Sequence, residues 1–185
     1  PELTVWVSEV GYPHLLDPSR LERSARRLYL DLFDPLWGEL APVPEANARI
    51  VGDDVLGWEP FPTTGHASHH VSYLHEPTRT AFVGDVAGVR IQEGPVFPPT
   101  PPPDIDLGLW HASIDLVQAW APAELALTHF GRWSDVDEHL GRLREQLDTW
   151  GDAARTSTPE EYATKVRDHI DSATTDPVTR SAYGQ

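Results

Sequence analysis

Three residues with the chemistry of metal ligands, His66, Asp85 and His129, stand at predicted junctions between strands and loops. Apolar runs at residues 71–74 and 81–83, joined by a polar turn, predict two short strands, with His66 before the first and Asp85 after the second. A third apolar run ends just before His129. Loops at strand ends commonly present catalytic and metal-binding groups.

Imidazole nitrogens and carboxylate oxygens form a ligand set that suits zinc, iron or manganese. A bridging carboxylate can hold two metal ions about 3.5–4 Å apart, and such a pair lowers the pKa of a shared water toward about 7. The chain has no Cys, so a thiolate site is excluded. Taken singly, a His at a strand end is more often structural and a Gly-Asp pair is more often a turn. The signal therefore lies in the set of three.

The remaining patterns predict a mixed α/β domain in which helices pack on a sheet. The predicted elements are a strand at residues 3–7, a helix at 18–33, short strands within 48–62, a strand at 125–128, and helices at 104–120, 135–150 and 159–172. Thr158 and Glu161 form a capping signal for the last helix. Asp104 is favoured over Asp106 as the cap of the helix at 104–120. Six prolines between residues 95 and 103 exclude helix there, and we favour an ordered wall beside the site over a linker.

Three stretches carry a resemblance to a known family. They are TGHASHH at residues 64–70, FVGD at 82–85 and LTHFG at 127–131. Together they resemble the second half of a metallo-β-lactamase-fold hydrolase. The resemblance implies an α/β fold, a four-layer αβ/βα sandwich with metals at one edge between its two sheets. It covers most of residues 1–150, the C-terminal portion of such a domain, and leaves residues 151–185 as a C-terminal helical extension.

The resemblance also implies roles for individual residues. His66 would bind the first metal, Asp85 would bridge both metals and orient the nucleophile, and His129 would bind the second metal. Two zinc ions are expected, with iron or manganese as alternatives. The implied activity is hydrolysis of an ester, thioester, lactone or similar carbonyl of a small molecule by a metal-bound hydroxide. His70 is expected to support a ligand through hydrogen bonds rather than to bind metal.

One departure from the family pattern stands out. The family's first metal motif, H-x-H-x-D-H, is absent, and His14 is the single His before His66. The sequence contains no Met and starts at Pro1, so we expect that residues preceding Pro1, carrying the missing motif, belong to the native protein. The alternative is a degenerate, non-enzymatic member of the fold that acts as a binding or assembly module.

The composition of the chain argues against some classes of binding partner. With 185 residues the chain suits one domain, and its formal net charge of −15 argues against nucleic acid or an anionic membrane as partner. Neither an apolar run long enough to span a membrane nor a secretory signal is seen, so a cytoplasmic location is expected.

The helices at 135–150 and 159–172 could cap the sandwich or build a homo-oligomer, and both alternatives stay open. Three further His residues on helices are expected to be solvated: His111, His139 and His169.

Overall fold

The computed structural model describes residues 3–52, 58–100, 105–129 and 131–183, and it divides the chain into two compact units. Unit 1 is Pro1–Leu56 and unit 2 is Gly57–Gln185. Each combines strands and helices, so the predicted α/β class is confirmed. Within the described ranges, no helix is both long enough and apolar enough to cross a bilayer.

Unit 1 holds a two-stranded parallel sheet and short helices. Its elements are β1 (Val5–Val7), α1 (Tyr12–Leu16), α2 (Ser19–Tyr29), the 3₁₀ turn η1 (Leu30–Leu32), α3 (Phe33–Trp37), the 3₁₀ turn η2 (Glu45–Asn47) and β2 (Ala48–Ile50). The prediction of one helix at 18–33 is wrong, because the backbone of Leu30 has a φ of 50° and ends α2 there. A non-glycine residue in this region is uncommon, and nothing in the sequence signals it.

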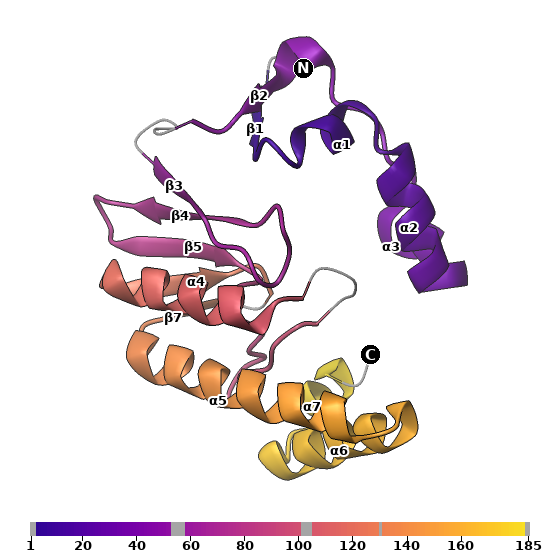
Figure 1. Cartoon of the computed structure of the whole chain (residues 1–185), viewed down its shortest axis with the longest axis vertical. Helices are drawn as coiled ribbons and strands as arrows, with labels where there is room; N and C mark the ends of the chain where they lie inside the picture. The colour runs from indigo at the N-terminus through magenta and orange to yellow at the C-terminus, as the bar shows by residue number, and fades with distance from the viewer. Residues whose placement is uncertain (1–2, 53–57, 101–104, 130, 184–185) are drawn as a thin grey trace. The chain divides into compact units, whose positions relative to one another are not determined.

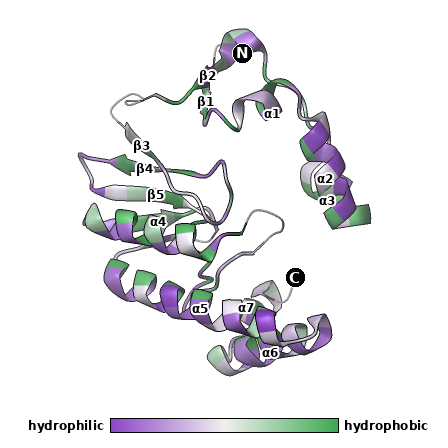
Figure 2. Ribbon diagram, in the orientation of Figure 1, coloured by the Kyte–Doolittle hydropathy of each residue, from purple (hydrophilic) through white to green (hydrophobic). Residues whose placement is uncertain are grey.

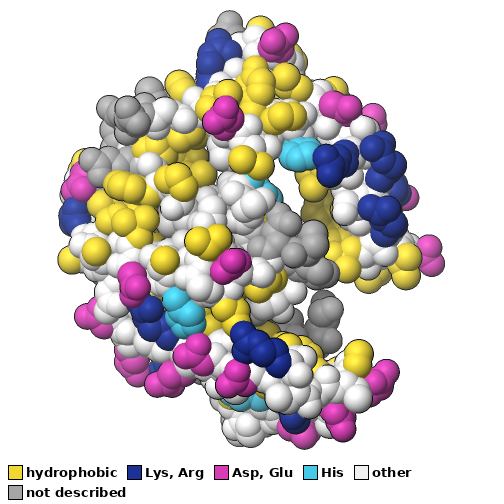
Figure 3. All heavy atoms as spheres, in the orientation of Figure 1, with side chains coloured by type: hydrophobic (Ala, Val, Ile, Leu, Met, Phe, Trp, Pro, Cys, Tyr) yellow, Lys and Arg dark blue, Asp and Glu magenta, His cyan; other side chains and the backbone are white. Residues whose placement is uncertain are grey.

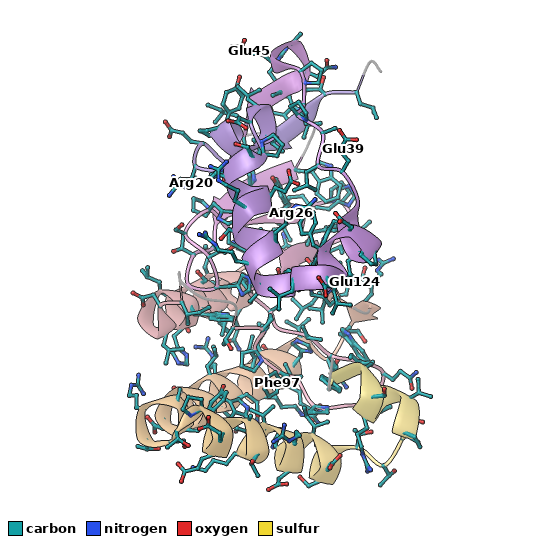
Figure 4. All side chains as sticks on the ribbon, turned by 90° about the vertical axis from the view of Figure 1, so that its right-hand side faces the viewer. Arg20, Arg26, Glu39, Glu45, Phe97 and Glu124 are labelled. Atoms are coloured by element: carbon teal, nitrogen blue, oxygen red, sulfur yellow. The ribbon has the colours of Figure 1, made fainter. Side chains whose placement is uncertain are left out.

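Helix α2 is strongly amphipathic and carries four arginines, which gather along it in Figure 3. Arg26, labelled in Figure 4, pairs with Glu22 and Asp34 at 2.8 Å each. Its guanidinium also lies 4.1 Å from the ring centroid of Phe33, a buried residue of unit 1. The contacts of Arg26 with Asp34 and Phe33 link α2 to α3.

Unit 2 is a five-stranded sheet with helices (Figure 1). Its elements are β3 (Trp58–Pro62), β4 (Val71–His75), β5 (Thr80–Gly84), α4 (Leu107–Ala119), β6 (Glu124–Leu127), β7 (Gly131–Trp133), α5 (Val136–Thr156), α6 (Pro159–Ala173) and α7 (Pro177–Tyr183). The strand order is β3-β4-β5-β6-β7, and β5 and β6 form its one parallel pair. Helix α4 makes the crossover that a parallel pair requires.

The sheet topology brings three strand ends to one edge. Gly84 at the end of β5 is in register with Leu127 at the end of β6, because these strands are parallel. Strand β4 runs antiparallel to β5, so its first residue, Val71, also lies at this edge. The loops before β4, after β5 and after β6 therefore meet.

The core of unit 2 lies between one face of the sheet and helices α4 and α5. Buried strand residues alternate, as in Ala81 and Val83 of β5, and they meet the apolar stripes of the two helices. Figure 2 shows α5 with hydrophobic and hydrophilic residues interleaved along its length. Trp110 of α4 and Leu143 of α5 are completely buried in this cluster.

Several boundaries differ from prediction. Helix α5 continues to Thr156 rather than ending at residue 150. Helices α1 and α7 and strand β7 were not predicted, because each is shorter than the stretch over which a helical or strand pattern can be recognised. The capping box of α6 forms as predicted, with Thr158 and Glu161 bonded reciprocally. Asp106 caps α4 by accepting the N–H of Leu109, whereas the favoured Asp104 lies outside the described residues.

Candidate metal centre

His66 is presented by a loop that is fastened to the first turn of α4. Gly65 has a φ of +121°, and a Cβ built on it would lie 2.3 Å from the backbone nitrogen of Trp110. The carbonyl of Gly65 accepts the N–H of Asp106 at 2.9 Å, and the hydroxyl of Ser113 donates to the carbonyl of Thr64 at 2.6 Å. Only glycine permits this close approach, which explains the Gly-His order in the sequence.

The ring of His66 is oriented from the other side by the proline-rich segment. Its Nδ1 lies 2.9 Å from the carbonyl oxygen of Pro99. A carbonyl can only accept, so Nδ1 carries the proton and Nε2 of the neutral ring presents a lone pair. The side chain is 8% exposed, and burial lowers the pKa of His66 while Asp85 opposes that shift. The described part of the proline run is thus a wall beside the site, as predicted.

Asp85 follows a glycine that the local packing requires. Gly84 has a φ of +51°, and a Cβ on it would lie 2.3 Å from Nε2 of His70. That nitrogen accepts the backbone N–H of Asp85 at 3.0 Å. The ring of His70 therefore occupies the space that a side chain at position 84 would need.

Both ring nitrogens of His70 are hydrogen-bonded. Nε2 is an acceptor, so Nδ1 carries the proton and donates to the hydroxyl of Thr63 at 2.8 Å. The hydroxyl oxygens of Thr63 and Ser72 lie 2.7 Å apart, which extends the chain of hydrogen bonds. Burial lowers the pKa of His70 to about 4, so the ring is neutral at pH 7. No ring nitrogen of His70 is left to bind a metal in this arrangement, which favours the support role that the sequence suggests.

Two further rings hold the turn that carries Asp85. Nε1 of Trp110 donates to the carbonyl of Val86 at 2.7 Å, and Nε2 of His139 donates to the carbonyl of Ala87 at 2.8 Å. His139 is 0% exposed, so the prediction that it is solvated is wrong. Burial lowers the pKa of His139, which keeps it neutral. Three consecutive residues are thus each fixed by a ring from a different part of the chain.

The three predicted ligands come together around the carboxylate of Asp85. Its Oδ2 lies 3.5 Å from Nε2 of His66, and its Oδ1 lies 3.2 Å from Nε2 of His129. Each oxygen therefore faces a different imidazole. Oδ1 is buried, and none of the described residues donates a hydrogen bond to it. The side chain of His129 is about half exposed.

This geometry fits a cation. Nε2 of His66 and Oδ2 of Asp85 are both acceptors, and two acceptors face each other favourably only with a positive charge between them. Burial disfavours a proton on His66, whereas a metal ion suits an imidazole–carboxylate pair. In the described ranges no group of three or more His, Asp or Glu forms a cluster that could hold one ion. The donors instead form two pairs that share Asp85, as a bridging carboxylate would.

Sequence reasoning missed Trp110 and His139 as residues that hold the turn after β5. For Trp110 the predicted burial was right, but its backbone partner depends on tertiary packing. For His139 a signal existed, because it lies three residues after Val136 and four before Leu143, on the buried stripe of α5. His111 is partly exposed and pairs with Asp148.

Comparison of the sequence with known protein families shows the family to which the chain belongs. The family profile described as the Metallo-beta-lactamase superfamily matches residues 4–130. The chain belongs to this superfamily. The comparison with curated protein sequences gives no match. The resemblance read from the three motifs is thereby confirmed.

Solved structures of the superfamily share the fold. An archaeal superfamily protein from Sulfolobus tokodaii is 28% identical, with a TM-score of 0.57 over 75% of this chain and 57% of that one. A family protein from Thermus thermophilus is 19% identical, with a TM-score of 0.59 over 86% of this chain and 59% of that one. A third, solved in a di-iron-bound form, is 16% identical, with a TM-score of 0.52 over 76% and 64%. The chain spans less than two thirds of each of these relatives.

Proposed function

We propose that the chain carries part of a dinuclear metal site of a hydrolase that acts on an ester, thioester, lactone or similar carbonyl of a small molecule. The observation that carries the proposal is the carboxylate of Asp85, whose two oxygens face Nε2 of His66 at 3.5 Å and Nε2 of His129 at 3.2 Å. Bound metal ions would polarise a carbonyl and acidify a water molecule. Membership of a largely hydrolytic superfamily supports the same activity.

The residues of the chain would serve this chemistry by holding donor atoms in place. The Pro99 carbonyl fixes the tautomer and the plane of His66 and makes its Nε2 a better donor to a metal. His70 fixes the amide of Asp85, so the carboxylate does not need to reorganise on binding a cation. Asp85 would bridge the ions and orient the nucleophile.

The metal we propose is zinc, two ions, with iron and manganese as alternatives. The donor set of imidazole and carboxylate accepts all three. Because a related fold has been solved with two irons, iron belongs in any test of binding. A net charge of −15 supports a small-molecule substrate over nucleic acid. The cytoplasmic location, the division at residue 150 and the homo-oligomer stay predictions.

The test is elemental analysis of the purified protein and of three variants, His66→Ala, Asp85→Asn and His129→Ala. We expect metal in the parent and its loss from all three. His111→Ala is the matched control, because that imidazole pairs with Asp148 on the helices and should leave the metal content unchanged.

Activity is then measured on the metal-loaded protein with one ester, one thioester and one lactone. Hydrolysis of any of them that disappears in Asp85→Asn supports the hydrolase. If the native protein, with any residues that precede Pro1, holds no metal, and the variants differ from it only in stability, the degenerate, non-enzymatic member is identified instead.

A further inference from the structure

Unit 2 contains a cavity of about 420 Å³ that lies apart from the ligand side chains. Its walls come from the segment at residues 98–100, the start of α4, the second half of α5 and one residue of α6. Leu147 and Trp150 of α5 are buried in its floor, and Ile105 and Leu107 complete an apolar wall. Small-molecule sites are commonly apolar cavities of about 300–1,000 Å³ with a few polar groups.

The cavity is lined by a positive charge, whereas the whole chain is strongly negative. Among the described residues that line it, Arg155 is the one charged side chain, in a protein with a net charge of −15. Arg155 is 63% exposed and pairs through Nη1 with Asp152, itself more than four-fifths exposed. Exposed pairs of this kind are weak, so a ligand carboxylate can compete for the guanidinium.

Aromatic side chains pack around Trp150 at the floor of the cavity. The ring of Tyr162 lies 5.8 Å from that of Trp150. Phe97, labelled in Figure 4, also packs against Trp150, at 5.5 Å between ring centroids. An aromatic cluster thus supports the floor, which makes the cavity a built feature of the helical layer.

We propose that this cavity binds a medium-chain alkanoate, with the alkyl chain on the apolar floor and the carboxylate at Arg155. The proposal stands independently of the metal site. The residue between two lining residues nonetheless contacts the proposed metal centre. Pro98 and Thr100 line the cavity, and the carbonyl of Pro99 accepts a hydrogen bond from His66. A bound alkanoate would touch both neighbours of Pro99.

The experiment is calorimetric titration of the protein, without added metal, with hexanoate, octanoate and decanoate. We expect saturable binding that tightens by about threefold to fourfold for each added methylene, because each is transferred from water to the floor. 1-Octanol tests the anion requirement and should bind more weakly than octanoate. No saturable heat with octanoate, or no dependence on chain length, would overturn the proposal.

Two pairs of variants locate the ligand. Arg155→Gln should weaken octanoate by about threefold to fivefold and leave octanol unchanged, with Arg167→Gln, an exposed arginine outside the cavity, as the control. Ala154→Phe places a ring among the residues that line the cavity and should weaken both ligands at least tenfold. Thr149→Phe is the control, because this position is also exposed on the same helix but does not line the cavity.

These outcomes separate the parts of the proposal. Octanoate binding that Arg155→Gln and Ala154→Phe leave unchanged would show a different site and refute it. Octanol binding as tight as octanoate would refute the carboxylate class. Thermal unfolding of each variant identifies any loss of fold, and if Ala154→Phe fails to fold, the chain-length series and the Arg155→Gln pair still decide.

Discussion

Replacing Gly84 by alanine should disturb the proposed metal centre without altering any proposed ligand. The new Cβ would lie 2.3 Å from Nε2 of His70, and the backbone would keep a φ of +51°, which alanine disfavours. The ring of His70 must then move, and the N–H of Asp85 loses its acceptor. The substitution therefore acts on the turn that holds the carboxylate.

The magnitude follows from three contributions. Left-handed backbone costs an alanine about 1–2 kcal/mol. An unsatisfied, partly buried amide at Asp85 adds about 1–3 kcal/mol. Against these, alanine reduces the entropy of the unfolded chain, which stabilises by about 0.4–1 kcal/mol. Together these ranges give a loss of about 1–4.6 kcal/mol in the free energy of unfolding for Gly84→Ala.

Urea denaturation, followed by circular dichroism, measures this change. The matched control is Gly141→Ala in α5, because a Cβ at Gly141 meets nothing within 4 Å. There alanine should stabilise by about 0.5–1 kcal/mol through helix propensity. The reasoning is refuted if the free energy of unfolding of Gly84→Ala lies within about 0.5 kcal/mol of that of the parent. It is also refuted if both substitutions change the free energy of unfolding in the same direction.

Three further predictions concern the supports of the site. Trp110→Phe leaves the buried carbonyl of Val86 without its donor and should cost about 1–3 kcal/mol in urea denaturation; a loss below about 0.5 kcal/mol would contradict it. The pKa of His70 is about 4 in the folded protein against 6.5 in the unfolded chain, so the unfolded chain binds more protons between these values. Stability should therefore fall as the pH falls from about 6.5 to about 4, and His70→Gln should flatten this dependence. Arg90→Gln breaks the 2.7 Å pair with Asp135 and should cost about 2–3 kcal/mol by the same denaturation assay, less than a fully buried pair because Asp135 is about a third exposed.

The proximity of the three proposed ligands could be predicted from sequence, because each stands at a strand end that the local residue pattern predicts. A short apolar run followed by Gly-Asp, and another by Thr-His, predict strand ends, and the sheet register then brings Asp85 and His129 to the same edge. The break of the first long helix could not be found, because Leu30 adopts a positive φ without glycine.

The supporting residues follow a different logic. His70, Trp110 and His139 are defined by the backbone atoms they meet, and those atoms belong to a turn that lies 15, 24 and 52 residues away in sequence. Residue type predicts that a buried ring needs a hydrogen-bond partner, but only the tertiary structure says which one. The proposed ligands of this site are thus suggested by its motifs, whereas the hydrogen bonds that hold the turn carrying Asp85 depend on packing between α4, α5 and the sheet.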